Sequence, residues 1–324
     1  MLSQNIILIK SIVWKTLDFF LGQNYIVIKC LKKGMIKMTF NTKFHLSDDR
    51  YINVELDTDN ELFVDPYLIY LGKDELSHTC SNRIVNYFSQ LLNAAETNND
   101  KFGEYLVKYL QENNEVRLGY SQSNPCGKGF GRNKGIELYE NIKNSKAMKS
   151  GLVKDIFDAS IMLEKVGYDK ISDMTICIIL EELITFTQTI CLDHNIKMES
   201  VKLNRPIWSD KRNKWIQLDN VSLPTHNEKP IILIPANYAK PILTYTYNRF
   251  YNKQMMPMYE RYAIKNPSEG LVKILKRGMV PAKTKIRKRF PCIKPDVVDY
   301  INENPDEYLS YKNKQLNYVN YNSI

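Results

Sequence analysis

A glycine-rich segment contains the residues of this sequence that are best suited to binding a phosphate. Five glycines fall between Gly119 and Gly135, whereas the whole chain of 324 residues has only 13. Glycine amides can approach an anion closely, and the lysines and arginine between them favour the same ligand. The alternative is a structural loop whose glycines only allow tight turns. The residues predicted to bind an anion or phosphate are Gly127, Lys128, Gly129, Gly131 and Arg132.

The same segment departs from the two best-known nucleotide-binding motifs. A P-loop needs Ser or Thr after Gly-Lys, but Gly129 follows Lys128 here. A dinucleotide-binding fingerprint would need glycine at the position of Arg132. The motif therefore indicates neither an ATPase nor a dinucleotide-dependent enzyme.

Several carboxylates are candidates for catalysis. Asp65 ends a short apolar run, Asp173 follows Ser172 at the start of a predicted helix, and Glu181 or Glu182 lies about two turns further along. If they converge, they could hold magnesium for phosphodiester hydrolysis. The alternative is that Asp65 forms an Asp-Pro turn and that Ser172 or Asp173 caps the helix. Whether the chain is an enzyme is left open, and magnesium would be its cofactor only if it is catalytic.

The sequence contains no pattern typical of a histidine metal site, a serine hydrolase, a zinc site or a disulfide framework. The four histidines share no metal-ligand spacing, and there is no Gly-x-Ser-x-Gly element. The six cysteines are far apart and irregularly spaced, which argues against a zinc site and against a disulfide framework. We therefore expect a reducing, cytoplasmic location.

The positive charge of the chain is concentrated near its C-terminus. No acidic residue occurs between Glu269 and Asp296, and the nine cationic residues there equal the formal net charge of +9. Nucleic acid is the favoured partner, because each neutralised phosphate releases counterions. A solvated tail without a partner and an anionic membrane are the alternatives. The ninth cation is Lys294, and the eight residues predicted to bind nucleic acid are Lys273, Lys276, Arg277, Lys283, Lys285, Arg287, Lys288 and Arg289.

Helices and short strands are clustered along the chain and do not alternate strictly, which predicts a mixed, helix-rich α+β fold with short strands in residues 39–66 and 200–235. Trp208 and Trp215 fit a hairpin whose tryptophans lie in the core, although stacking on bases would use the same pair. The strands are predicted at 39–56 as a hairpin, 61–66, 208–215 and 231–235. The helices are predicted from Ser81, from near Asp100, at 137–149 and 152–166, and from Ser172 to His194, the longest.

Composition changes divide the chain into three predicted parts. Residues 1–38 form an extension, explained either by a misassigned start codon or by an extra amphipathic helix. Residues 39–262 form the α+β core, and residues 263–324 form a basic, mostly helical appendage. No apolar run reaches the length of a membrane helix, and the N-terminus lacks the pattern of a signal peptide, so no membrane partner is predicted.

Four short motifs resemble a family of uncharacterised prokaryotic proteins. They are Leu62-Phe63-Val64-Asp65-Pro66, Leu118-Gly119-Tyr120-Ser121 with Gly127-Lys128-Gly129, Ile171-Ser172-Asp173-Met174-Thr175, and Pro230-Ile231-Ile232-Leu233-Ile234-Pro235. In that family they form an N-terminal region, and longer members continue into a restriction-endonuclease-like domain. This sequence shows no Glu-x-Lys metal element near Ile324, so the resemblance implies a chain without the nuclease domain.

The first hypothesis is therefore a cytoplasmic, nucleic-acid-associated protein related to restriction or phage defence, non-catalytic as it stands. A nuclease subunit is a further possible partner. The second hypothesis is a metal-dependent nuclease that uses Asp65 and Asp173. The third is a structural partner subunit whose glycine segment is an interface.

Overall fold

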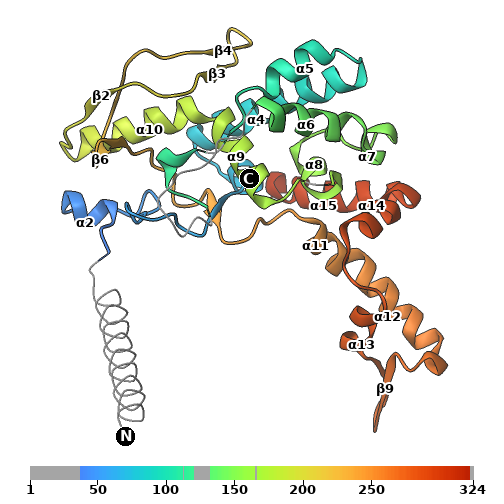
Figure 1. Cartoon of the computed structure of the whole chain (residues 1–324). Helices are drawn as coiled ribbons and strands as arrows, with labels where there is room; N and C mark the ends of the chain where they lie inside the picture. The colour runs from blue at the N-terminus through green and yellow to red at the C-terminus, as the bar shows by residue number, and fades with distance from the viewer. Residues whose placement is uncertain (1–36, 112, 120–131, 165, 322–324) are drawn as a thin grey trace, which may run out of the picture. The chain divides into compact units, whose positions relative to one another are not determined.

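The computed structural model describes residues 37–111, 113–119, 132–164 and 166–321. Residues Phe40–Ile324 form one compact unit, and the fold below is that of this unit. Helices predominate in it, and its described strands are short and pair antiparallel in two-stranded sheets (Figure 1). The predicted helix-rich α+β fold is confirmed, together with short strands in residues 39–66 and 200–235.

The first part of the unit contains one short strand and four helices. Asp65 caps the helix that begins at Pro66, whose ring fixes a helical φ angle at the first position. The helix predicted near Asp100 is confirmed, with Asn99 as its N-cap. The elements are α2 (Phe40–Phe44), β1 (Phe63–Val64), α3 (Pro66–Leu71), α4 (Glu75–Glu96) and α5 (Asp100–Val107), followed by a 3₁₀ turn at Asn114–Val116.

Two local predictions in this part are wrong. Residues 39–56 do not form a hairpin, because Phe40–Phe44 is helical and Tyr51 bridges to Pro235 instead of to a neighbouring strand. Ser81 is not an N-cap, because α4 begins six residues earlier, where Asp74 accepts a hydrogen bond from the Ser77 amide at 2.9 Å.

Five helices form the middle of the unit. The single long helix predicted from Ser172 is wrong: Gly167 caps a helix that already starts at Tyr168, and the chain bends by 71° around Ile179. Ser172 and Asp173 therefore lie inside a helix and do not cap it. The elements are α6 (Arg132–Lys143), α7 (Lys146–Lys149), α8 (Ile156–Met162), α9 (Tyr168–Ile178) and α10 (Leu180–Asp193).

Short antiparallel strands follow α10. Trp208 pairs with Trp215 in the predicted hairpin, and both rings are buried, so the prediction that the tryptophans lie in the core is confirmed. The strands are β2 (Glu199–Val201), β3 (Ile207–Ser209), β4 (Lys214–Ile216), β5 (Val221–Leu223), β6 (Thr225–His226), β7 (Lys229–Pro230) and β8 (Ala239–Lys240). They pair as β2 with β5, β3 with β4, β6 with β7, and β8 with β1.

The last part of the unit contains helices and one further hairpin. Tyr308 and Tyr311 of the last helix are buried in the same hydrophobic cluster as β1 and α4, so this part packs on the rest of the unit. The elements are α11 (Tyr247–Phe250), a π turn (Tyr251–Met255), α12 (Met256–Lys265), a 3₁₀ turn (Pro267–Glu269), β9 (Val272–Leu275), β10 (Gly278–Pro281), α13 (Lys283–Arg289), α14 (Lys294–Glu303) and α15 (Pro305–Tyr321).

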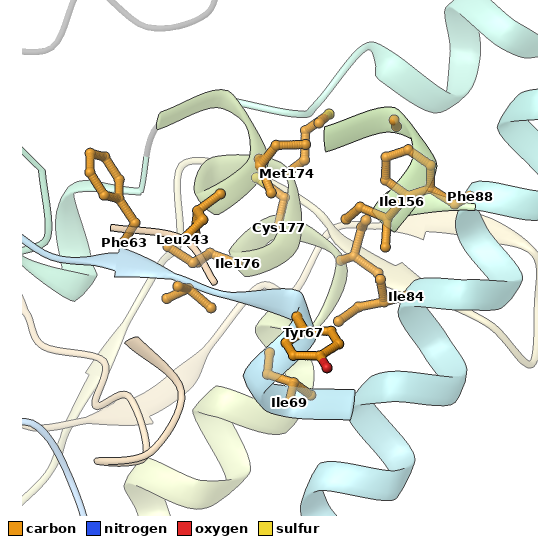
Figure 2. Packing of buried hydrophobic residues seen from close by; sticks show 14 of the residues in the cluster. Phe63, Tyr67, Ile69, Ile84, Phe88, Ile156, Met174, Ile176, Cys177 and Leu243 are labelled. Carbon is orange, nitrogen blue, oxygen red and sulfur yellow. The ribbon is translucent and has the colours of Figure 1, made fainter. Parts of the chain in front are cut away.

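The hydrophobic core joins elements that are far apart in the sequence. Figure 2 shows Phe63 of β1, Ile84 of α4 and Ile176 of α9 among the buried side chains that pack together. Their burial is the main driving force that holds these helices around the short strands.

Candidate functional site

Asp65, the first candidate catalytic residue, is buried and hydrogen-bonded within the fold. It is 1% exposed, and its carboxylate accepts hydrogen bonds from the amides of Tyr67 at 3.0 Å and Thr244 at 2.6 Å. Burial raises the pKa of this carboxyl above its ordinary range. The contacts fix the start of α3 and the segment before α11, so both carboxylate oxygens are already used inside the fold.

Asp173, the second candidate, lies half-exposed in the middle of α9. In the part of the chain that the structure describes, no three His, Cys, Asp or Glu side chains are placed to hold a metal ion. The structure therefore does not bring Asp65 and Asp173 into a metal centre of the kind that the second hypothesis needs.

The predicted phosphate site at Gly127, Lys128, Gly129 and Gly131 lies outside the described residues, and Arg132 is the first residue of α6. At the end of the segment, Gly135 has a packing role. A Cβ atom there would lie 2.6 Å from the carbonyl oxygen of Val107, which is closer than such atoms can approach. This glycine thus lets α6 pack directly on the backbone of α5.

The eight predicted cationic residues are all exposed, and we call the region that they occupy the basic surface. It covers the β9–β10 hairpin and α13, which both contact α12 (Figure 1). Within the described residues only Lys283 pairs with a carboxylate, that of Glu260 at 3.0 Å. Lys285 donates to the Gly270 carbonyl and Arg287 to the Asn252 side chain, each at 3.0 Å. The Arg289 guanidinium lies over the Phe290 ring, 5.5 Å from its centroid, and the remaining positive side chains of this surface are exposed.

Lys294, the ninth cation of the acid-free stretch, does not belong to this surface. Its ammonium donates to the carbonyls of Ser160 at 3.2 Å and Val166 at 3.1 Å, and burial lowers its pKa to about 8. It holds the start of α14 against the end of α8.

The hairpin of the basic surface also exposes large apolar side chains. Ile274 is 84% exposed and lies opposite Met279, which is 47% exposed. Lys276 and Arg277 form the two-residue turn between the strands. A hairpin that presents two cations at its tip and an apolar pair behind them has the composition of a contact surface.

A second feature is a cavity of about 580 Å³ between α4, α10 and the β3–β4 turn, which we call the Arg83 cavity. The Arg83 guanidinium lies in its wall, 2.9 Å from Glu181 Oε2 and 2.7 Å from Glu182 Oε1. Asp210 Oδ2 lies 3.4 Å from Arg83 Nε. Arg83 also donates to the carbonyl of Trp208 at 3.1 Å. Three carboxylates thus surround one guanidinium.

Of these residues, Glu181 and Glu182 are candidate carboxylates in the sequence. Sequence reasoning missed Arg83 and Asp210, because they come from two other segments. One signal was present: Glu181 and Glu182 are adjacent acids at the start of a helix with a buried apolar face, and a buried acid needs a partner. The partner could not be identified, since Arg83 lies about a hundred positions away in the sequence.

The fold and these surfaces define a helix-rich α+β protein with a basic hairpin and a separate acidic cavity. A family model matches residues 42–246, which is more than half of the chain, and the chain therefore belongs to the family described as Domain of unknown function (DUF8370). The match includes the Arg83 cavity and ends before the basic surface. No curated protein and no solved structure matches the chain.

No single helix among the described residues is long and apolar enough to cross a membrane. The consecutive helices α9 and α10 reach the required length and composition only when taken together, and they bend by 71°.

Proposed function

We propose that this protein binds nucleic acid through the basic surface, contacts the phosphate backbone and does not cleave its ligand. The observation that carries the proposal is the basic surface itself: eight exposed cations on two neighbouring elements, with one carboxylate partner among the described residues. A cation that has no internal partner is free to neutralise a phosphate, and the release of counterions then favours binding.

The geometry of the hairpin supports contact with a groove of the nucleic acid. Lys276 and Arg277 at the turn would reach phosphates first, and Ile274 and Met279 follow on one face of the ribbon. Apolar side chains of this kind can pack against base steps or sugars in a groove. A solvated tail without a partner would not be expected to present large apolar side chains on a paired hairpin.

We also infer a cytoplasmic location for the protein. Cys80, Cys177, Cys191 and Cys292 are free, which is compatible with the cytoplasmic location that we infer. A role in restriction or phage defence, with a separate nuclease subunit as partner, follows only from the motif resemblance and stays a prediction.

Binding of the purified chain to labelled duplex DNA, single-stranded DNA and RNA tests this function. Charge reversal by Arg287→Glu, Lys288→Glu and Arg289→Glu should weaken binding at least tenfold at low salt. A matched control reverses three exposed lysines elsewhere, Lys101, Lys149 and Lys197. Equal affinity of the wild type and the α13 variant would contradict the proposal. Binding to anionic vesicles but not to nucleic acid would contradict it as well.

A further inference from the structure

Glu182 in the Arg83 cavity is satisfied on only one of its two oxygens. Oε1 lies 2.7 Å from the Arg83 guanidinium, whereas Oε2 is buried and has no hydrogen-bond partner within the described part of the chain. The side chain is only 10% exposed, and it lines the wall of the cavity. A buried carboxylate oxygen without a donor is costly, and a ligand that supplies a donor would remove that cost.

The charges around Glu182 favour a positive ligand. Glu181 on the same helix and Asp210 in the β3–β4 turn add two more carboxylates, against the single guanidinium of Arg83. Lys211 also lines the cavity, but its side chain is exposed. Three carboxylates therefore surround the Arg83 guanidinium, whose side chain is 12% exposed, and they outnumber the positive groups of the cavity, so a cation is favoured over an anion such as a phosphate.

The protonation of Glu182 reflects this incomplete pairing. Burial raises its pKa to about 7, and the nearby acids Glu181 and Asp210 act in the same direction, while Arg83 opposes them. Cys80, which faces it from α4, is a neutral thiol near neutral pH because burial raises the pKa of that group to about 12. A bound cation would stabilise the ionised carboxylate, so binding would release a proton near neutral pH.

The remainder of the cavity suits a small organic molecule. Leu76 and Phe186 give it apolar walls, and Thr79, Thr185 and Thr189 add hydroxyl groups. Its volume of about 580 Å³ falls within the range of small-molecule sites. A ligand that fits would combine an apolar body with a charged N–H donor.

We propose that the Arg83 cavity binds a small organic cation, an amine or amidine with an apolar body, whose N–H group donates to the Glu182 carboxylate. This site is separate from the basic surface and prefers a ligand of the opposite charge. Ligand binding in this cavity therefore does not depend on nucleic-acid binding.

Calorimetric titration with benzamidine and benzylamine tests this, with benzamide as a neutral probe of the same shape. The cations should bind and release a proton, and benzamide should bind at least tenfold more weakly. Affinity should rise about tenfold per pH unit below the Glu182 pKa and become constant above it. No binding by either cation, or equal binding of benzamidine and benzamide, would overturn the proposal.

Two variants separate the site from an effect on folding. Glu182→Gln should abolish the preference for cations over benzamide, while Glu199→Gln, an exposed acid outside the cavity, should leave it unchanged. Thr189→Phe should fill the cavity from its exposed rim without touching the ion cluster and should prevent binding of both cations. Retained cation binding in a folded Glu182→Gln or Thr189→Phe variant would overturn the proposal.

Discussion

The Val64 amide donates a hydrogen bond of 2.9 Å to the hydroxyl of Ser172, across 108 positions of sequence. Both residues belong to motifs that stand out in the sequence, and both are buried. A third motif makes a similar contact, because the Leu233 amide donates to the Thr187 hydroxyl at 2.9 Å. Hydroxyls on α9 and α10 thus satisfy backbone amides of extended segments that lack a full sheet, which gives these motifs a structural purpose.

Ser172→Ala should therefore destabilise the protein by about 1–3 kcal/mol, because the Val64 amide would stay buried without an acceptor. Chemical denaturation measures this change in the free energy of unfolding. Ser200→Ala, at an exposed position, should change it by less than about 0.5 kcal/mol. Equal stability of the two variants would show that the hydrogen bond to Ser172 adds no net stability.

Substitutions at Asp74 and Ser81 test where helix α4 begins. Asp74→Ala should cost about 1 kcal/mol, because the Ser77 amide loses its capping carboxylate. Ser81→Ala should be neutral or slightly stabilising, since Ser81 lies within α4 and alanine favours helix. The reverse order of the two melting temperatures would place the helix start at Ser81.

Three elements show how much of the fold could be predicted from the sequence. The helix at Asp100 was found because its cap and apolar spacing are local. The hairpin expected at 39–56 failed because Tyr51 pairs with Pro235, a partner that no local pattern reveals. The start of α4 failed because the apolar spacing becomes clear only a turn or more after the true cap.

The candidate sites also differ in whether the sequence alone could reveal them. The basic surface was predictable, because charge density is a property of consecutive residues. The burial of Lys294, the ninth cation of the stretch, could not be predicted, since sequence does not show which lysine of a strip is buried. The Arg83 cavity was missed except for Glu181 and Glu182, because the cluster exists only after α4, α10 and the β3–β4 turn come together.

The last helix is held to the core by a buried ion cluster. Lys312 Nζ lies 2.6 Å from Asp155 Oδ2 and 2.6 Å from Asp158 Oδ2, and Asp158 is fully buried. Lys312→Met should destabilise the protein by about 3–5 kcal/mol, because a buried carboxylate would lose its countercharge. Lys314→Met, two residues along and exposed, should have little effect on the melting temperature. Similar melting of both variants would contradict this role for α15.

Glu182 should make stability depend on pH. Its pKa is raised from 4.5 to about 7, so between these values the folded protein holds a proton that the unfolded chain has lost. Its contribution is complete below pH 4.5 and is lost as pH rises through 7, by about 3 kcal/mol in all.

This contribution is measured as the difference in the free energy of unfolding between the wild type and Glu182→Gln, in which the side chain no longer titrates. The difference should move in favour of the variant as pH rises from 4.5 to 8. Glu181→Gln, whose side chain is 47% exposed in the wild type, is the matched control. A difference that is constant with pH would contradict the raised pKa of Glu182.

The salt dependence of duplex DNA binding tests the central claim most directly. Neutralising Arg287, Lys288 and Arg289 to Gln should reduce the slope of log K against log salt by about 0.9 for each phosphate that these side chains no longer neutralise, and thus by about 2–3 in total. Neutralising Lys101, Lys149 and Lys197 should leave the slope unchanged. If the wild type binds with no salt dependence, or if both triple variants keep the wild-type slope, the basic surface does not bind nucleic acid.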